Sequence, residues 1–148
     1  MSQHSTTLTW SRNDTSFAYK EYPRDHQIDY GNGHTIPCTA AAEFLGNPDL
    51  PDPEQAFVGS LSSCHMLTFL AFCSMQKLTL DSYTDKAVGF LEKGENGKPI
   101  LARVELHPKT VFAEGIEVSP EKLAELHHKA HQECFLANSV KTDIQTIL

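Results

Sequence analysis

Apolar residues recur with helical spacing through the middle of the chain, from Pro53 to Gln76. Within PEQAFVGSLSSCHMLTFLAFCSMQ, apolar side chains return every three or four positions, and further apolar groups lie on the flanks. The run begins at Asp52, Pro53 and Glu54, which is typical of a helix start. Asp is an N-cap, proline suits the first position, and an acid lies near the positive end of the helix dipole. The pattern predicts a long helix that is covered on most sides.

The centre of this predicted helix is polar. The apolar run is interrupted by Ser60, Ser62, Ser63, Cys64 and His65. A bilayer would tolerate such residues least at its centre, so we expect a core helix rather than a membrane span. A polar patch with a thiol in the middle of a buried helix calls for a chemical explanation.

Alternation of apolar and polar residues predicts strands on both sides of the central helix. We expect strands at 7–10, 16–22, 80–91 and 100–111, a hairpin over 27–39 around Gly31-Asn32-Gly33, and an edge strand within 140–148. A second helix is expected from Ser119-Pro120-Glu121 to about Glu133, by the same cap, proline and acid chemistry. The order βββ–α–ββ–α–β predicts an α+β fold with helices packed on an antiparallel sheet.

Composition narrows the class of protein. A chain of 148 residues with 40% hydrophobic content is expected to form a single domain, residues 1–148, with its own core. A net charge of −7 without a basic cluster argues against nucleic acid or an anionic membrane as partner. The opening MSQHSTTLTW lacks the blocks of a secretion signal, so we expect a cytoplasmic protein. The four cysteines lie far apart, which in a reducing compartment favours catalytic, metal-binding or inert thiols over structural disulfides.

Cys64 has two interpretations: a small buried hydrophobe, or a nucleophile in a polar setting. A thiol with a pKa of ~8.5 is less than ~10% thiolate near neutral pH, so a nucleophilic Cys64 needs a cation nearby. His65 is adjacent on the helix and points elsewhere, so that cation must come from another segment. Arg24 and Arg12 are candidates, although an exposed ion pair is the ordinary role of such an arginine. Glu54 is already explained as an acid in the first helical turn.

A zinc site is a competing hypothesis. His127, His131 and Cys134 have i, i+4, i+7 spacing and share one face of the second helix, with Cys64 as the fourth ligand. That set would make the chain a zinc-binding regulatory or structural protein. Against it, three ligands come from one element, and solvated helix positions are the more ordinary explanation of His127 and His128.

Four stretches together resemble the OsmC/Ohr family of peroxide-reducing proteins, nearer its OsmC-like branch. A cysteine in S-S-C-H-M followed 70 positions later by another in A-H-x-x-C-F-x-A-N-S is a specific combination, and the order and approximate spacing match over nearly the full chain. The stretches are YPRDH (22–26), PEQAFVGSLSSCHM (53–66), LDSYTDKAVGFL (80–91) and HHKAHQECFLANSV (127–140).

The resemblance implies thiol-dependent reduction of organic hydroperoxides to alcohols, without a bound cofactor. It assigns Cys64 as the peroxidatic cysteine and Cys134 as the resolving cysteine, joined as a disulfide in the cycle. Arg24 corresponds to the arginine that holds the thiolate, and Glu54 to the acid that orients this arginine. Since ten residues of helix separate Glu54 from Cys64 by ~15 Å, how these two groups reach the thiol is left open.

The resemblance also implies an assembly and a reductant. Family members form intertwined homodimers with active sites at the subunit interface, and an external dithiol, possibly lipoyl-type, reduces them. Cys38 and Cys73 belong to neither motif, and Cys73 is expected in the core. A third hypothesis is a binding module on the same fold with an inert cysteine pair.

Overall fold

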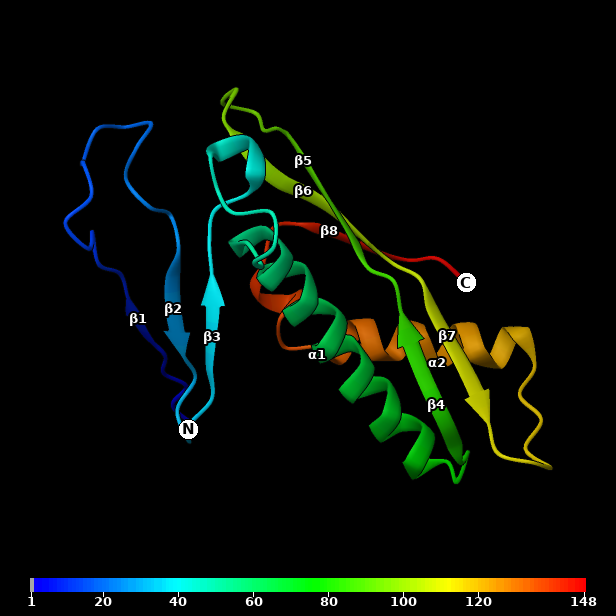
Figure 1. The fold of residues 1–148 in the computed structure, drawn as a ribbon. Helices are drawn as coiled ribbons and strands as arrows, with labels where there is room; N and C mark the ends of the chain where they lie inside the picture. Colours follow the sequence, from blue (N-terminus) through cyan, green and yellow to red (C-terminus); the bar gives the residue numbers. More distant parts are fainter. Residues whose placement is uncertain (1) are drawn as a thin grey trace. The chain divides into compact units, whose positions relative to one another are not determined.

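The computed structural model describes residues 2–148, and contacts within the chain divide it into two compact units. The first unit ends at Ala56, and the second is Phe57–Leu148. Figure 1 labels the helices and strands of both units.

The first unit is built on a three-stranded antiparallel sheet of order β1-β2-β3. Its hairpin turns at Gly31-Asn32-Gly33, all three with positive φ, where glycine carries no steric penalty. This confirms the predicted hairpin. The strands are β1 (Thr7–Thr9), β2 (His26–Asp29) and β3 (Thr35–Cys38), followed by the short 3₁₀ helix η1 (Ala42–Phe44).

The strand expected at 16–22 is wrong, because this segment forms turns and bends. Its alternating aromatic rings pack on one another instead of on a sheet: Phe17 lies 5.3 Å from Tyr22 and 6.1 Å from Trp10 between ring centroids. The indole of Trp10 donates a hydrogen bond to the carbonyl of Pro23 at 2.8 Å. An aromatic cluster held by local turns thus gives the same alternating pattern as a strand.

Helix α1 (Pro53–Met75) has the predicted bounds to within one residue. Its start is a reciprocal capping box: the Asp52 carboxylate accepts from the backbone N–H of Gln55 at 2.7 Å, and the Gln55 side chain accepts from the N–H of Asp52 at 3.1 Å. Local chemistry therefore fixes where the helix begins.

Within one chain, α1 buries a single stripe. Its buried residues recur every four positions, at Leu61, His65, Phe69 and Cys73, whereas Leu67 is 60% and Met75 76% exposed. The expectation that α1 is covered on most sides is wrong for the single chain. Among the described residues α1 is also the one helix long and apolar enough to cross a membrane, a criterion that core helices meet as well.

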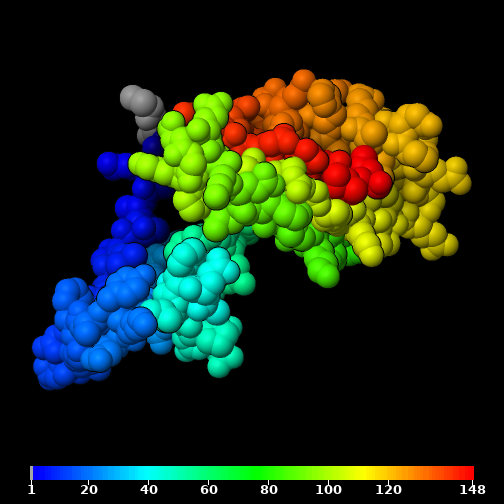
Figure 2. All heavy atoms as spheres, turned by 90° about the horizontal axis from the view of Figure 1, so that it is seen from above, coloured from blue at the N-terminus to red at the C-terminus, as the bar shows by residue number. Residues whose placement is uncertain are grey.

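Two small sheets support α1 in the second unit. One pairs β4 (Leu80–Asp85) with β7 (Pro108–Phe112), antiparallel; the other has the order β5 (Val88–Lys93), β6 (Pro99–Leu106), β8 (Asp143–Thr146). Strand β8 confirms the edge strand expected within 140–148, but it runs parallel to β6, so this sheet is mixed whereas the other pairings are antiparallel as expected. Figure 2 shows β8, in red, at the surface between the orange α2 and the green and yellow strands.

Each of the two long strands expected at 80–91 and 100–111 is divided in two. Asp85 holds this corner, because its carboxylate accepts hydrogen bonds from the hydroxyl of Ser62 on α1 and from the backbone N–H of His107. Such long-range bonds change the direction of both strands, which the alternation of apolar residues does not reveal.

Helix α2 (Pro120–Glu133) confirms the second predicted helix, with the Ser119 hydroxyl accepting from the N–H of Lys122. It crosses α1 (Figure 1) and shares a fully buried core with it, formed by Phe69, Cys73, Leu126 and Ala130. A second core joins α1 to β6 through Leu61, Val104 and Leu106. The middle of α1 is thereby held between α2 and the sheets.

Candidate active site

Two free thiols from α1 and α2 are in direct contact. Cys64 lies in the middle of α1, and Cys134 is the C-cap residue of α2, where the backbone is already extended. The Cys134 thiol donates to the sulfur of Cys64 with an Sγ–Sγ distance of 2.8 Å. The structure thus brings together the two cysteines that the sequence singled out, 70 positions apart.

The two thiols differ in exposure. Cys134 is 1% exposed and Cys64 is half-buried, so solvent reaches the pair at Cys64. Burial raises the pKa of Cys134, and its hydrogen bond to Cys64 raises it further. Cys134 therefore remains a protonated donor that faces the sulfur of Cys64.

Cys134 is held by the short helical turn that follows it. The backbone N–H of Asn138 donates to the carbonyl of Cys134 at 3.1 Å, and η2 (Ala137–Ser139) continues the chain toward β8. The turn thus fixes the backbone that carries the buried thiol.

A second pair bridges the same two helices through imidazoles. Nε2 of His65 lies 3.0 Å from Nδ1 of His127, and both rings are buried. His127 was expected to be a solvated helix residue, and the structure buries it instead. The available signal was its spacing from Leu123 and Ala130, which places all three on one face of α2.

Arg24 and Glu54 lie in the first unit. The guanidinium of Arg24 donates to the carbonyls of Tyr19 and Tyr22 and lies 3.7 Å from the centroid of the Tyr22 ring. Within residues 2–148 Arg24 forms no ion pair, with Glu54 or with any other acid. The roles of Arg24 and Glu54 at Cys64 stay predictions.

The zinc set of Cys64, His127, His131 and Cys134 is not assembled. No group of three or more His, Cys, Asp or Glu side chains suited to a metal ion occurs in residues 2–148. The cysteines contact each other, whereas His127 bonds to His65 and stacks on Phe69 with 4.1 Å between ring centroids. The three residues of this set that come from the α2 segment therefore do not converge on one point, because Cys134 and His127 contact different partners.

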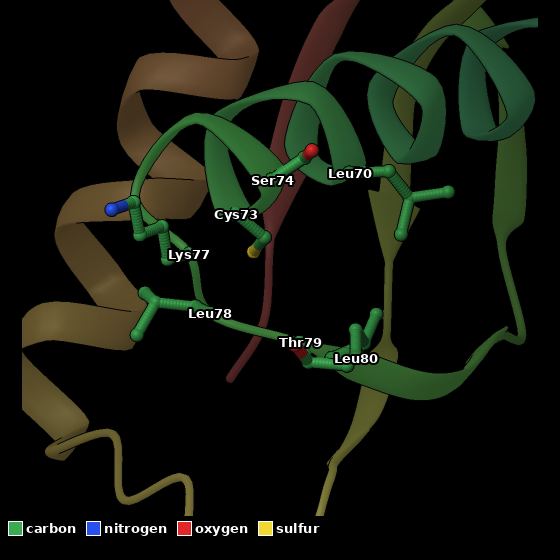
Figure 3. A pocket seen from close by; sticks show the side chains of 7 residues that line it. All are labelled: Leu70, Cys73, Ser74, Lys77, Leu78, Thr79 and Leu80. Carbon is green, nitrogen blue, oxygen red and sulfur yellow. The ribbon is translucent and has the colours of Figure 1, made fainter.

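The other two cysteines lie apart from the pair. Cys38 is buried at the end of β3. Cys73, as expected, is in the core, where burial raises its pKa. Figure 3 shows its sulfur beside a cavity of about 290 Å³ at the turn from α1 to β4, lined by Leu70, Ser74, Lys77, Leu78, Thr79 and Leu80.

Comparison with known proteins places the chain among similar folds. Residues 46–148 match the family model described as OsmC-like protein. An OsmC-like protein of unknown function from Vibrio cholerae is 39% identical, with a TM-score of 0.95 and 99% of each chain covered. None of the curated proteins is similar enough to count as a match.

Two more distant structures share the fold. An organic hydroperoxide resistance protein from Elizabethkingia anophelis is 22% identical, with a TM-score of 0.72 over 99% of this chain and 93% of the other. An organic hydroperoxide resistance protein from Vibrio cholerae, with captopril bound in one active site, is 19% identical, with a TM-score of 0.70 over 99% of this chain and 90% of the other.

Proposed function

The chain belongs to the OsmC-like protein family, and we propose that it is a cysteine-based peroxidase that reduces organic hydroperoxides to alcohols. Relatives that share its fold are named for organic hydroperoxide resistance. The observation that carries the proposal is the contact between Cys64 and Cys134, one thiol open to solvent and the other buried behind it.

The chemistry needs only these thiols and an external reductant. The Cys64 thiolate attacks the distal oxygen of the hydroperoxide; the O–O bond breaks, Cys64 becomes a sulfenic acid, and the alkoxide takes a proton and leaves as the alcohol. The Cys134 thiol then attacks the Cys64 sulfur, forming the disulfide and releasing water. A dithiol, lipoyl-type by the family resemblance, restores both thiols by exchange and becomes a disulfide itself.

We assign Arg24 the role of the cation that favours the Cys64 thiolate and stabilises negative charge on the peroxide oxygens. Its guanidinium is held by carbonyl oxygens, which orient it without neutralising its charge. Glu54 is assigned the acid that orients Arg24, from its place in the motif.

We place the working protein in the cytoplasm, as a homodimer with the active site at the subunit interface. The chain exposes apolar side chains along α1, including Leu67 and Met75, which a second copy would cover. Four free cysteines suit a reducing compartment.

The decisive experiment is intact-mass analysis and peptide mapping after one equivalent of cumene hydroperoxide. We expect the loss of two hydrogens, mapped to a Cys64–Cys134 link, and stoichiometric cumyl alcohol. A Cys64→Ser variant should form neither, whereas Cys73→Ala should behave as the parent chain. Two free thiols and intact hydroperoxide after treatment would refute the proposal.

Replacing Arg24 tests the cation. If Arg24 has the proposed role, Arg24→Gln should slow the alkylation of Cys64 near neutral pH, because a positive charge would no longer favour its thiolate. The measurement is the rate of Cys64 alkylation by iodoacetamide as a function of pH, with Arg12→Gln as the matched control. A profile that is the same in Arg24→Gln and in the parent protein would remove Arg24 from the site.

A further inference from the structure

Helices α1 and α2 are joined by two polar bridges, and the proposed chemistry uses only one of them. Beside the thiol pair, His65 and His127 form a hydrogen bond of 3.0 Å in which the two ring planes are inclined by only 1°. The rings are 1% and 2% exposed. His65 follows Cys64 directly on α1, and His127 lies two helical turns before Cys134 on α2, so both bridges depend on how α2 lies across α1.

The imidazole pair has a cost that apolar residues would avoid. When both rings are neutral, one donates and the other accepts, and this leaves one outer N–H and one outer lone pair. Among the described residues those outer atoms, Nδ1 of His65 and Nε2 of His127, have no hydrogen-bond partner. Buried polar atoms without partners destabilise a fold, so two leucines here would pack at a lower cost.

The surroundings keep the pair neutral and fixed in place. Phe69 stacks on the His127 ring with 16° between the planes. The charged or titratable groups that face the pair include His131 on α2 and Asp85 on β4, which act on His65, and Tyr83 on β4, whose ring centroid lies 6.5 Å from that of His127. Burial lowers the pKa of His65 and of His127 to about 4. Two neutral imidazoles bond in one relative position, whereas two apolar side chains tolerate sliding.

We propose that the His65–His127 hydrogen bond is a positioning device for the cysteine pair, holding α2 in the register on α1 that keeps the Cys134 sulfur against Cys64. Its mechanistic meaning rests on the proposed function, since closing the Cys64–Cys134 disulfide is the second step of that cycle. The two histidines touch no substrate and act through the geometry of the thiols.

The test is the equilibrium of the disulfide in glutathione redox buffer. In this buffer the two protein thiols react with oxidised glutathione to give the Cys64–Cys134 disulfide and two molecules of reduced glutathione, and the equilibrium constant of this reaction is the quantity compared. The fraction of the link is measured by acid quench and peptide mass. We expect His127→Leu and His65→Met each to lower the equilibrium constant by about 10-fold, the effect of one ordinary hydrogen bond.

Rescue distinguishes positioning from general damage. The amide of Gln places a polar atom near Nε2 of histidine, and the amide of Asn places one near Nδ1, so the double variant His65→Gln/His127→Asn restores a bond between the helices. Its constant should return to within about 3-fold of the parent, as double-mutant coupling requires. The exposed neighbour offers the matched control His128→Gln, which should leave the constant unchanged.

An unchanged constant in a folded His127→Leu or His65→Met protein overturns the proposal, and so does a double amide variant no better than the single variants. The readout uses no peroxide. If the parent protein consumes no hydroperoxide but the variants shift the disulfide equilibrium constant, the peroxidase proposal is refuted and the positioning role stands. If the protein turns over hydroperoxide normally and the variants leave the constant unchanged, the positioning role is refuted and the peroxidase proposal stands.

Discussion

Cys64 and Cys73 lie on the same helix, nine positions apart, and have opposite surroundings. Cys64 is half-buried and its sulfur meets another thiol. Cys73 is 1% exposed and packs in the core among Phe69, Leu126 and Ala130. The comparison shows that neither the residue type nor the helix decides whether a thiol lies in the core or against a second thiol. The elements that pack against it do.

One helix supplies both environments. Along its buried face α2 presents Leu126 and Ala130 to Cys73, and at its C-terminal end it presents Cys134 to Cys64. The difference between the two sites is therefore set by where α2 ends, since its C-cap residue, Cys134, brings the second sulfur to α1.

The largest expected contrast is in alkylation. In the native, reduced protein we expect Cys64 to react with iodoacetamide at least ~1,000-fold faster than Cys73. Cys73 becomes accessible only when the core opens, which for core elements costs several kcal/mol. A pulse of reagent followed by peptide mass measures both rates, and a urea-unfolded sample calibrates them. Comparable native rates would remove the distinction between the two sites.

The middle of α1 should also respond to acid. With their pKa lowered from 6.5 to about 4 by burial, His65 and His127 remain neutral where the unfolded chain binds protons. The free energy of unfolding should therefore fall as pH decreases from about 6.5 to about 4, by on the order of 3 kcal/mol per imidazole at most. Below pH 4 these two groups should cause little further loss.

Urea unfolding between pH 7 and pH 4 measures this slope. Carboxylates add to it at the acid end, so the informative quantity is the difference between the parent and His127→Phe, with His128→Gln as the control. An identical slope in the parent and in His127→Phe would contradict neutral burial of the pair.

The smallest effect is expected at the end of α1, beside Cys73. Lys77 has φ of 59° and terminates the helix. The N–H of Lys77 donates to the carbonyl of Ser74 at 3.0 Å, and the N–H of Leu78 donates to the carbonyl of Cys73 at 2.9 Å. This is the geometry of a Schellman cap, which favours glycine. Lys77→Gly should raise the free energy of unfolding by ~0.5–1 kcal/mol.

Urea unfolding reads this effect directly, and Lys129→Gly within α2 is the matched control. There glycine should destabilise by about 1 kcal/mol, because the position is helical. Destabilisation by both substitutions would mean that the Lys77 side chain itself stabilises the turn.

The sequence predicted the features that depend on neighbouring residues. The capping box at Asp52 and the cap at Ser119 fix both helix starts, and Gly31-Asn32-Gly33 fixes the hairpin. The positions where distant segments meet were not predictable. The corner at Asp85 and the parallel pairing of β8 both depend on contacts between segments more than 20 positions apart.

In the candidate site, too, some residues could be predicted from the sequence and others could not. A resemblance between motifs identified Cys64 and Cys134, and the structure places their sulfurs in contact. The bond between His65 and His127 could not be foreseen, since it requires knowing how α2 crosses α1. Arg24 and Glu54 rest on the motif alone.

The 2.8 Å contact has a stereochemical consequence. Two sulfurs at this separation leave no room for an oxygen atom between them, so the Cys134 side of Cys64 is closed to the hydroperoxide. In the proposed cycle the hydroperoxide must therefore transfer its oxygen to the solvent-facing side of the Cys64 sulfur. The Cys134 sulfur then attacks from the opposite side, in line with the departing hydroxide. The solvent-facing side of the Cys64 sulfur is thus oxidised first in the proposed cycle, and the disulfide to Cys134 then forms on the opposite side.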